Sequence, residues 1–111
     1  LRCNPLGKNP SDVWAINKVT SGKGRSSKER TEHPAQFPEE MIERIIKVST
    51  NEGDLVIDPF MGSGTVAAVA LRLGRRVVGF EKKRKYCKII KKRLQDYSCG
   101  ITKTICKNKE A

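Results

Sequence analysis

Two short apolar runs, separated by a glycine-rich turn and a segment with helical spacing, most constrain how this chain can fold. Residues 55–57 and residues 76–80 consist largely of branched aliphatic side chains, which is typical of strands buried on both faces. Between them, residues 66–73 space their apolar side chains as a helix does, and Gly74 ends the segment. Strand, helix and strand in this order predict a parallel pair joined by a right-handed crossover. The predicted fold class is therefore α/β.

Two further helices are predicted on either side of this unit. Residues 38–49 begin with Pro38, which suits a first helical turn, and two acidic residues follow where the helix dipole favours them. Residues 82–97 place their apolar side chains on one helical face, and the tail suggests a short strand around residues 101–105. Two or three strands are too few for a doubly wound sheet. We therefore expect one half of a larger α/β domain, completed by another segment or another chain.

The turn after the first predicted strand has the residues that a nucleoside-binding loop requires. Gly62, Gly64 and Ala67 match the pattern G-x-G-x-x-G/A at the end of a strand and the start of a helix. Glu81 ends the next strand, about 20 residues after the first glycine, where a carboxylate accepts hydrogen bonds from ribose hydroxyls. We predict a nucleoside bound across the carboxyl ends of these two strands.

The residues just before the turn indicate which nucleoside this is. A dinucleotide rests its pyrophosphate on such a turn, but Asp58, followed by Pro59, stands there and would repel it. The same carboxylate would attract an ammonium group, and S-adenosylmethionine carries an ammonium, a sulfonium and a ribose without any phosphate. We therefore predict S-adenosylmethionine as the cofactor and disfavour a fragment of an NAD-dependent dehydrogenase. A role for Asp58 only as a helix cap or turn former stays open.

Three segments of the sequence resemble those of a known enzyme family. The segment DPFMGSGT, residues 58–65, resembles the cofactor motif of amino-directed DNA methyltransferases. HPAQFPEEMIERII, residues 33–46, resembles the segment that comes directly before this motif in the beta class, whose cofactor-binding half follows its catalytic half. NPLGKNPSDVWAI, residues 4–16, is similar to the stretch between the recognition region and that segment. The resemblance extends over residues 4–97.

The resemblance implies the cofactor-binding half of a Rossmann-like S-adenosylmethionine-dependent methyltransferase sheet. It also implies methyl transfer to an exocyclic amino group of a DNA base in a restriction-modification setting. Adenine N6 is the favoured methyl acceptor. A cytosine N4 methyltransferase and a non-catalytic nucleic-acid-binding remnant of the same fold remain alternatives. Glu81 would hold the ribose, and the segment with His33 and Gln36 would close over the methionine carboxylate. The implied cofactor-binding residues are His33, Gln36, Asp58, Pro59, Phe60, Gly62, Ser63, Gly64, Thr65 and Glu81.

One element of the family does not occur in this sequence. The catalytic tetrapeptide, an Asp, Asn or Ser followed by Pro-Pro and an aromatic residue, has no counterpart among these 111 residues. In the beta class it lies upstream, and the chain begins with Leu1 rather than Met. We therefore assign no catalytic residue and expect the chain to be inactive alone. Its expected partner is an N-terminal catalytic half, in the same polypeptide or in a separate subunit.

The charge balance favours a polyanionic partner. Lys and Arg number 23 against 12 Asp and Glu, which gives a formal net charge of +11 at pH 7. We expect duplex DNA as the first candidate and an anionic membrane surface as a distant second. No apolar run approaches the ~18–20 residues that span a bilayer. Eight basic side chains between Lys82 and Arg93 are read as a solvated helix face, with phosphate contact as the alternative. The basic loop of residues 18–32 is the better candidate for touching DNA, with a plain linker as the alternative.

The remaining expectations concern cellular setting and organisation. Four scattered cysteines and a single histidine predict free thiols and no metal site, and no secretory signal is visible, which together indicate a cytoplasmic protein. The expected organisation has four parts. Residues 1–17 end an upstream region, residues 18–32 form a basic flexible loop, residues 33–97 form the S-adenosylmethionine-binding part, and residues 98–111 form a basic tail.

Overall fold

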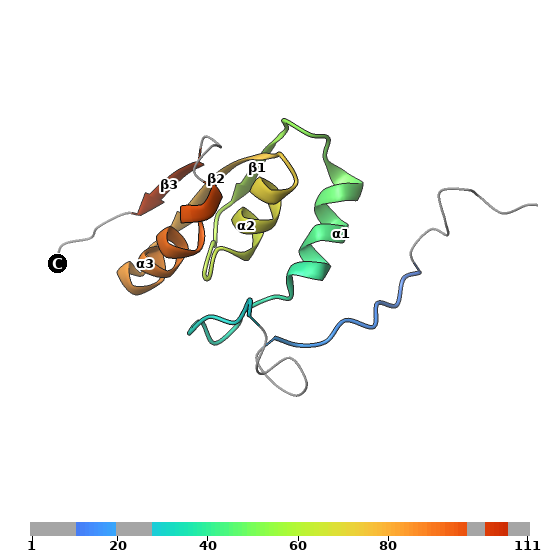
Figure 1. The fold of residues 1–111 in the computed structure, drawn as a ribbon, viewed down its shortest axis with the longest axis horizontal. Coiled ribbons are helices and arrows are strands. Elements are labelled where there is room, and N and C mark those ends of the chain that lie inside the picture. The colour runs from blue at the N-terminus through green and yellow to red at the C-terminus, as the bar shows by residue number, and fades with distance from the viewer. Residues whose placement is uncertain (1–10, 20–27, 98–101, 107–111) are drawn as a thin grey trace, which may run out of the picture.

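The computed structural model describes residues 11–19, 28–97 and 102–106 of the chain (Figure 1). Three parallel strands form one sheet in the order β1-β2-β3. The predicted α/β class and the parallel pairing of the first two strands are therefore confirmed. The elements are α1 (Glu39–Ser49), β1 (Leu55–Asp58), α2 (Thr65–Arg72), β2 (Arg76–Glu81), α3 (Arg84–Arg93), the 3-10 helix η2 (Gln95–Tyr97) and β3 (Thr102–Cys106).

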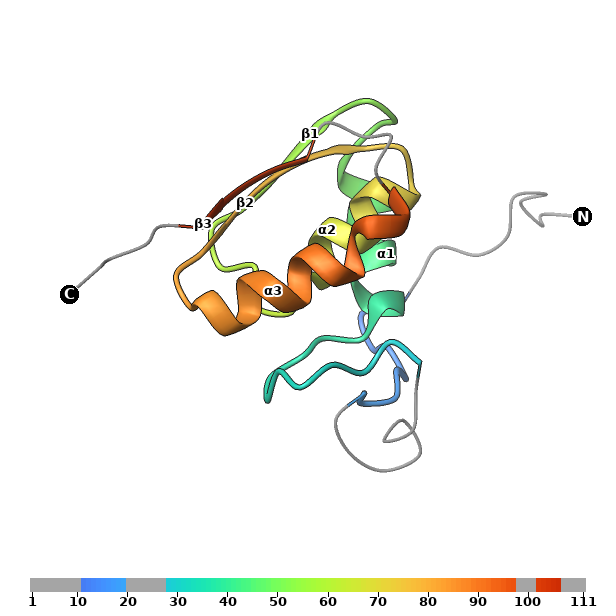
Figure 2. The ribbon, with the colours of Figure 1, turned by 60° about the vertical axis from the view of Figure 1, so that its left-hand side comes forward.

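The helices lie together on one side of the sheet, as the edge-on view in Figure 2 shows. The strands advance in one direction along the sheet, so two right-handed crossovers place α2 and α3 on the same face. The register pairs Val56 with Val77 and Asp58 with Gly79, and these four residues share one face of the sheet. Val77 and Gly79 are buried, which identifies this face as the one that the helices cover.

The core lies between this face and the helices. Small side chains of α2, chiefly alanines, let the helix approach the sheet closely, while α1 and α3 contribute larger aliphatic side chains. Burying such side chains stabilises the fold by roughly 1.5–3 kcal/mol each relative to exposure. The buried cluster comprises Ile42, Ile46, Met61, Ala67, Val69, Ala70, Val77 and Ile90.

The opposite face of β1 is open within the described part of the chain. Leu55 is 47% exposed and Ile57 is 62% exposed, whereas Val56 between them is half-buried. The prediction that residues 55–57 are buried on both faces is therefore wrong for this structure. The reason is topological, because both crossover helices cover the same side and nothing in the described residues covers the other.

The third predicted helix, residues 82–97, is shorter than its pattern suggested. The carboxylate of Glu81 accepts a hydrogen bond from the Lys83 amide at 2.7 Å, and α3 begins only after Lys83. Its end at Arg93 is followed by Leu94 in a non-helical conformation and then by η2. The short strand expected around residues 101–105 is present as β3.

One cysteine departs from the expected free thiol. Cys87 is buried on α3 and is disulfide-bonded, so the prediction of a free thiol at this residue is wrong. The side chains of the other cysteines, residues 3, 99 and 106, lie outside those that the structure describes. Scattered spacing along the sequence carries no information about which thiols the fold brings together.

Candidate functional site

The glycine turn leaves β1 at its carboxyl end and leads into α2. Gly62 and Gly64 have φ angles of +53° and +77°, a left-handed conformation that residues with a Cβ rarely adopt. One carboxylate oxygen of Asp58 accepts a hydrogen bond from the Phe60 amide at 3.0 Å. The turn is also tied to the neighbouring strand, because the Met61 amide donates to the carbonyl oxygen of Phe80 at 3.0 Å.

Glu81 joins the end of β2 to this turn. One carboxylate oxygen accepts from the Gly62 amide at 2.9 Å and the other from the Lys83 amide at 2.7 Å. The carboxylate therefore lies between the carboxyl ends of β1 and β2, where the spacing of the sequence predicted an acidic side chain.

A cavity of about 420 Å³ opens beside the turn. Asp58 and Glu81 reach it from the two strands, the turn and the first residue of α2 contribute four further predicted residues, and His33 reaches it from a segment that precedes α1. The structure thus brings together residues from three separate parts of the sequence. The predicted residues that line this cavity are His33, Asp58, Phe60, Gly62, Ser63, Thr65 and Glu81.

His33 lies directly over the turn. A Cβ built on Gly62 would come within 3.0 Å of the His33 Nε2 atom, so a side chain at position 62 would displace the imidazole. The His33 ring also packs against Tyr86 of α3, with ring centroids 4.4 Å apart. The Ala35 amide donates a hydrogen bond to Nδ1 of His33 at 3.2 Å.

Gln36 does not line the cavity. It is buried, its side-chain oxygen accepts from the Thr31 amide at 2.8 Å, and its amide group donates to the carbonyl oxygen of Glu29. These contacts fix the backbone of the segment that carries His33. Gln36 is therefore placed to act on the site through that segment.

Gly64 also faces away from the cavity. A Cβ at this position would lie 3.1 Å from Cγ1 of Ile90 on α3. The glycine is thus required by its positive φ and by the close approach of α3. The sequence interpretation assigned Gly64 to cofactor binding and did not predict its contact with α3.

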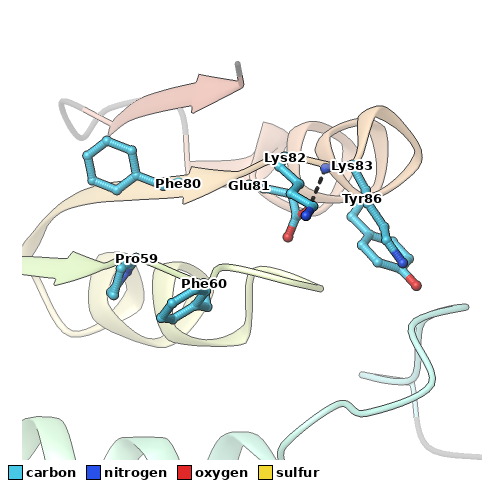
Figure 3. Close-up of a pocket in the computed structure, with 7 residues that line it drawn as sticks. All are labelled: Pro59, Phe60, Phe80, Glu81, Lys82, Lys83 and Tyr86. Atoms are coloured by element: carbon cyan, nitrogen blue, oxygen red, sulfur yellow. Dashed lines mark hydrogen bonds between the residues drawn. The ribbon is translucent and has the colours of Figure 1, made fainter. Parts of the chain in front are cut away.

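A second cavity of about 350 Å³ adjoins the first, and Phe60 and Glu81 line both (Figure 3). Its wall is largely aromatic and apolar, and two lysines and Glu81 also line it. Pro59, the remaining predicted residue, lies here. Figure 3 shows the carboxylate of Glu81 between β2 and the turn. The lining residues are Pro59, Phe60, Phe80, Glu81, Lys82, Lys83 and Tyr86.

Sequence reasoning missed Gly79 and Tyr86. A Cβ on Gly79 would overlap the side chain of Met61, so this glycine lets the turn fold back over β2. A glycine inside a strand is the available signal for such a close approach. Tyr86 was assigned only to the apolar face of a helix, and its contact with His33 depends on how α3 packs.

An ion-pair network joins the helices near this site. Arg72 of α2 contacts Glu39 at 2.6 Å and Glu43 at 3.0 Å, both on α1. Desolvation is the largest single influence on the pKa of Arg72 and lowers it, but the hydrogen bond and charges of these glutamates outweigh it and the pKa is raised. A hydrogen bond from Lys47 is the main cause that holds the pKa of Glu43 below its ordinary value.

Residues 11–19, 28–97 and 102–106 contain no cluster of three His, Cys, Asp or Glu side chains arranged to hold a metal ion. In the same described residues, no helix has the length and apolar character needed to cross a bilayer.

Known proteins have sequences similar to most of this chain. The family model described as DNA methylase matches residues 2–92. The chain is 54% identical over 95 residues to the Type II methyltransferase M.ScaI of Streptomyces caespitosus, which covers 86% of this chain and 31% of that protein. It is 48% identical over 89 residues to the Type II methyltransferase M.BglII of Bacillus subtilis, which covers 80% of this chain and 24% of that protein. The chain therefore spans about a third or less of these relatives.

A solved structure agrees with the sequence matches. The M1.HpyAVI–SAM complex superposes with a TM-score of 0.63 at 37% identity, over 79% of this chain and 43% of that one. This likeness confirms the predicted fold class, and the family model extends over most of the chain. The chain belongs to the DNA methylase family, the amino-directed DNA methyltransferases.

Proposed function

We propose that this chain is the S-adenosylmethionine-binding part, residues 33–97, of a DNA methyltransferase that methylates adenine N6 in duplex DNA within a restriction-modification system. The observation that carries the proposal is the cavity in which Asp58, Glu81 and His33 meet the glycine turn. Cytosine N4 remains the alternative target, because the same cofactor chemistry serves both amino groups.

The cavity fits the amino-acid end of this cofactor. Its volume of about 420 Å³ falls in the range of ~300–1,000 Å³ that ligand sites occupy. Asp58 is half-buried, and only one of its carboxylate oxygens has a hydrogen-bond partner among the described residues, the Phe60 amide. The other oxygen is available for an ammonium group, and such a charge-assisted hydrogen bond is stronger than a neutral one.

The nucleoside end fits the junction of the two cavities. Each oxygen of Glu81 accepts one backbone N–H, and an ionised carboxylate has further lone pairs for ribose hydroxyls. A base attached to that ribose would extend into the second cavity, where Pro59, Phe60 and Phe80 offer apolar surface for stacking. Both halves of the nucleoside then lie across the carboxyl ends of β1 and β2.

His33 and the turn would enclose the methionine portion. His33 lies over Gly62, and Ser63 and Thr65 line the same cavity. Gln36 and Gly64 support this enclosure from behind, by holding the His33 segment and by admitting α3. Bound S-adenosylmethionine would supply a methyl group on a sulfonium, and the residues named here bind and orient it rather than activate the base.

A catalytic half would dock against β1. This strand forms one edge of the sheet, and its uncovered face carries Leu55 and Ile57. Further strands and the catalytic tetrapeptide would come from that half, and duplex DNA would lie between the two. In the basic loop expected to touch DNA, residues 18–32, the central residues 20–27 lie outside the described residues. We place the assembled protein in the cytoplasm, where duplex DNA is accessible.

The test is complementation. The chain is co-expressed with the part of M.ScaI outside the matched region, and tritiated methyl incorporation into duplex DNA is measured for each piece and for the pair. We expect methyl transfer only from the pair, with activity that falls as salt rises because phosphate contacts are screened. Calorimetry measures S-adenosylmethionine binding separately. Robust turnover by this chain alone, or no cofactor binding by the pair, would overturn the proposal.

A further inference from the structure

Arg93, the last residue of α3, turns into the protein although it belongs to a run of basic residues. Its side chain is only 12% exposed. One guanidinium nitrogen, Nη1, donates to the carbonyl oxygen of Ser63 at 3.3 Å and to Oγ1 of Thr65 at 3.1 Å. The other, Nη2, donates to Glu39 of α1. A single side chain therefore joins α3, α1 and the glycine turn.

The side chains of Ser63 and Thr65 have few other hydrogen-bond partners among the described residues. Ser63 and Thr65 are buried, and apart from Arg93 their hydroxyls bond to each other at 3.1 Å. Helix α2 begins after Gly64 without a hydrogen bond from any capping side chain. One helical turn before Arg93, Ile90 packs behind Gly64. The back of the turn thus rests on α3, whereas its front faces the cavity.

We propose that Arg93 is a positioning residue for the cofactor site, which holds Ser63 and Thr65 in the geometry that binds the methionine end. The inference rests on the proposed function, because it assigns a second layer to that same site. The sequence interpretation assigned Arg93 to a solvated or DNA-contacting helix face. In the structure its side chain points into the protein instead.

To hold the turn and α1 together, residue 93 needs several hydrogen-bond donors in fixed directions. A planar guanidinium donates several hydrogen bonds in fixed directions, whereas a lysine ammonium is a compact charge on a flexible stem. Arg93→Lys keeps the charge next to Glu39 but cannot reach both the turn and α1 in the same geometry. Arg72→Lys is the matched control, since Arg72 also pairs with Glu39 but, among the described residues, its hydrogen bonds and ion pairs go to α1 and not to the turn.

The experiment uses the full chain purified with its complementing half and measures two quantities. Calorimetry gives the dissociation constant of S-adenosylmethionine, and hydrogen exchange of the ligand-free protein follows the amides of Gly62 and Gly64. We expect Arg93→Lys to weaken binding about tenfold, the factor that corresponds to 1.4 kcal/mol, and to accelerate exchange in the turn. Arg72→Lys should leave both within about twofold of wild type, since it alters two partly exposed ion pairs to α1 and no contact with the turn.

The two readouts separate failure of this inference from failure of the proposed function. Wild-type affinity and wild-type exchange in Arg93→Lys would overturn the positioning role. Equal losses in Arg93→Lys and Arg72→Lys would also overturn it, because general destabilisation of the helix network would then be the cause. If the wild-type protein binds no S-adenosylmethionine, the proposed function fails, and exchange in the turn alone decides whether Arg93 holds it.

Discussion

The carboxylate of Glu81 accepts a hydrogen bond from the Gly62 amide at 2.9 Å, and thereby closes the end of β2 onto the glycine turn that follows β1. Its second oxygen accepts a hydrogen bond from the Lys83 amide, and α3 begins at the following residue, Arg84. The residue that we propose to hold the ribose therefore also shapes its own site. Loss of this carboxylate is expected to change both cofactor affinity and the local fold.

Glu81→Gln tests this double role. Glutamine retains one acceptor oxygen but presents an NH2 group to either Gly62 or Lys83, which leaves one backbone amide without its acceptor. We expect stability to fall by about 1–3 kcal/mol, with weaker S-adenosylmethionine binding that is still stronger than in Asp58→Ala. Urea unfolding and calorimetry measure the two effects. Glu52→Gln, an exposed carboxylate outside both cavities, is the control, and unchanged stability in Glu81→Gln would contradict the proposed turn closure.

Asp58→Asn separates charge from turn formation. The asparagine oxygen still accepts from the Phe60 amide, so the turn is retained, but the negative charge proposed to meet the ammonium is lost. We expect roughly a ten- to hundredfold loss in S-adenosylmethionine affinity, as for removal of a hydrogen bond to a charged group. Asp58→Ala should abolish binding. Calorimetry showing near wild-type affinity for Asp58→Asn would mean that Asp58 only forms the turn.

The difference in stability between Gly64→Ala and Gly53→Ala measures how closely α3 packs against the turn. Both glycines have positive φ, so both substitutions should cost about 1–2 kcal/mol of backbone strain. A Cβ at Gly53 meets nothing within 4 Å, whereas one at Gly64 meets Ile90. We expect Gly64→Ala to cost about 1 kcal/mol more through overpacking, and Gly64→Val to abolish cofactor binding through the displaced turn. Equal denaturant midpoints for the two alanine variants would rule out the packing contribution.

Ile57→Thr tests the uncovered face of β1. The isoleucine is 62% exposed on the face that we propose to bind the catalytic half. A polar β-branched residue should raise the monomer fraction of the chain alone and lower the methyl transfer recovered by complementation. Val48→Thr is the control, because Val48 is 84% exposed on α1, away from the sheet. Light scattering and tritium incorporation are the measurements, and undiminished complementation by Ile57→Thr would place the docking surface elsewhere.

The strand-turn-helix-strand unit could be predicted from the sequence because its signals are local. Short aliphatic runs specify the strands, and two glycines in the turn permit the positive φ angles found there. The spacing from the turn to Glu81 follows from the length of one crossover helix and one strand. These features depend on neighbouring residues, so they need no knowledge of long-range packing.

The tertiary structure decided the features that depend on which surfaces meet. The sequence indicated apolar strands, but the topology left Leu55 and Ile57 uncovered by placing both crossover helices on one face. It indicated a basic helix, but packing turned Arg93 inward against Glu39 and the turn. A one-dimensional pattern distinguishes apolar from charged positions. The partner that a given side chain meets is set by contacts between segments far apart in the chain, which only the folded arrangement defines.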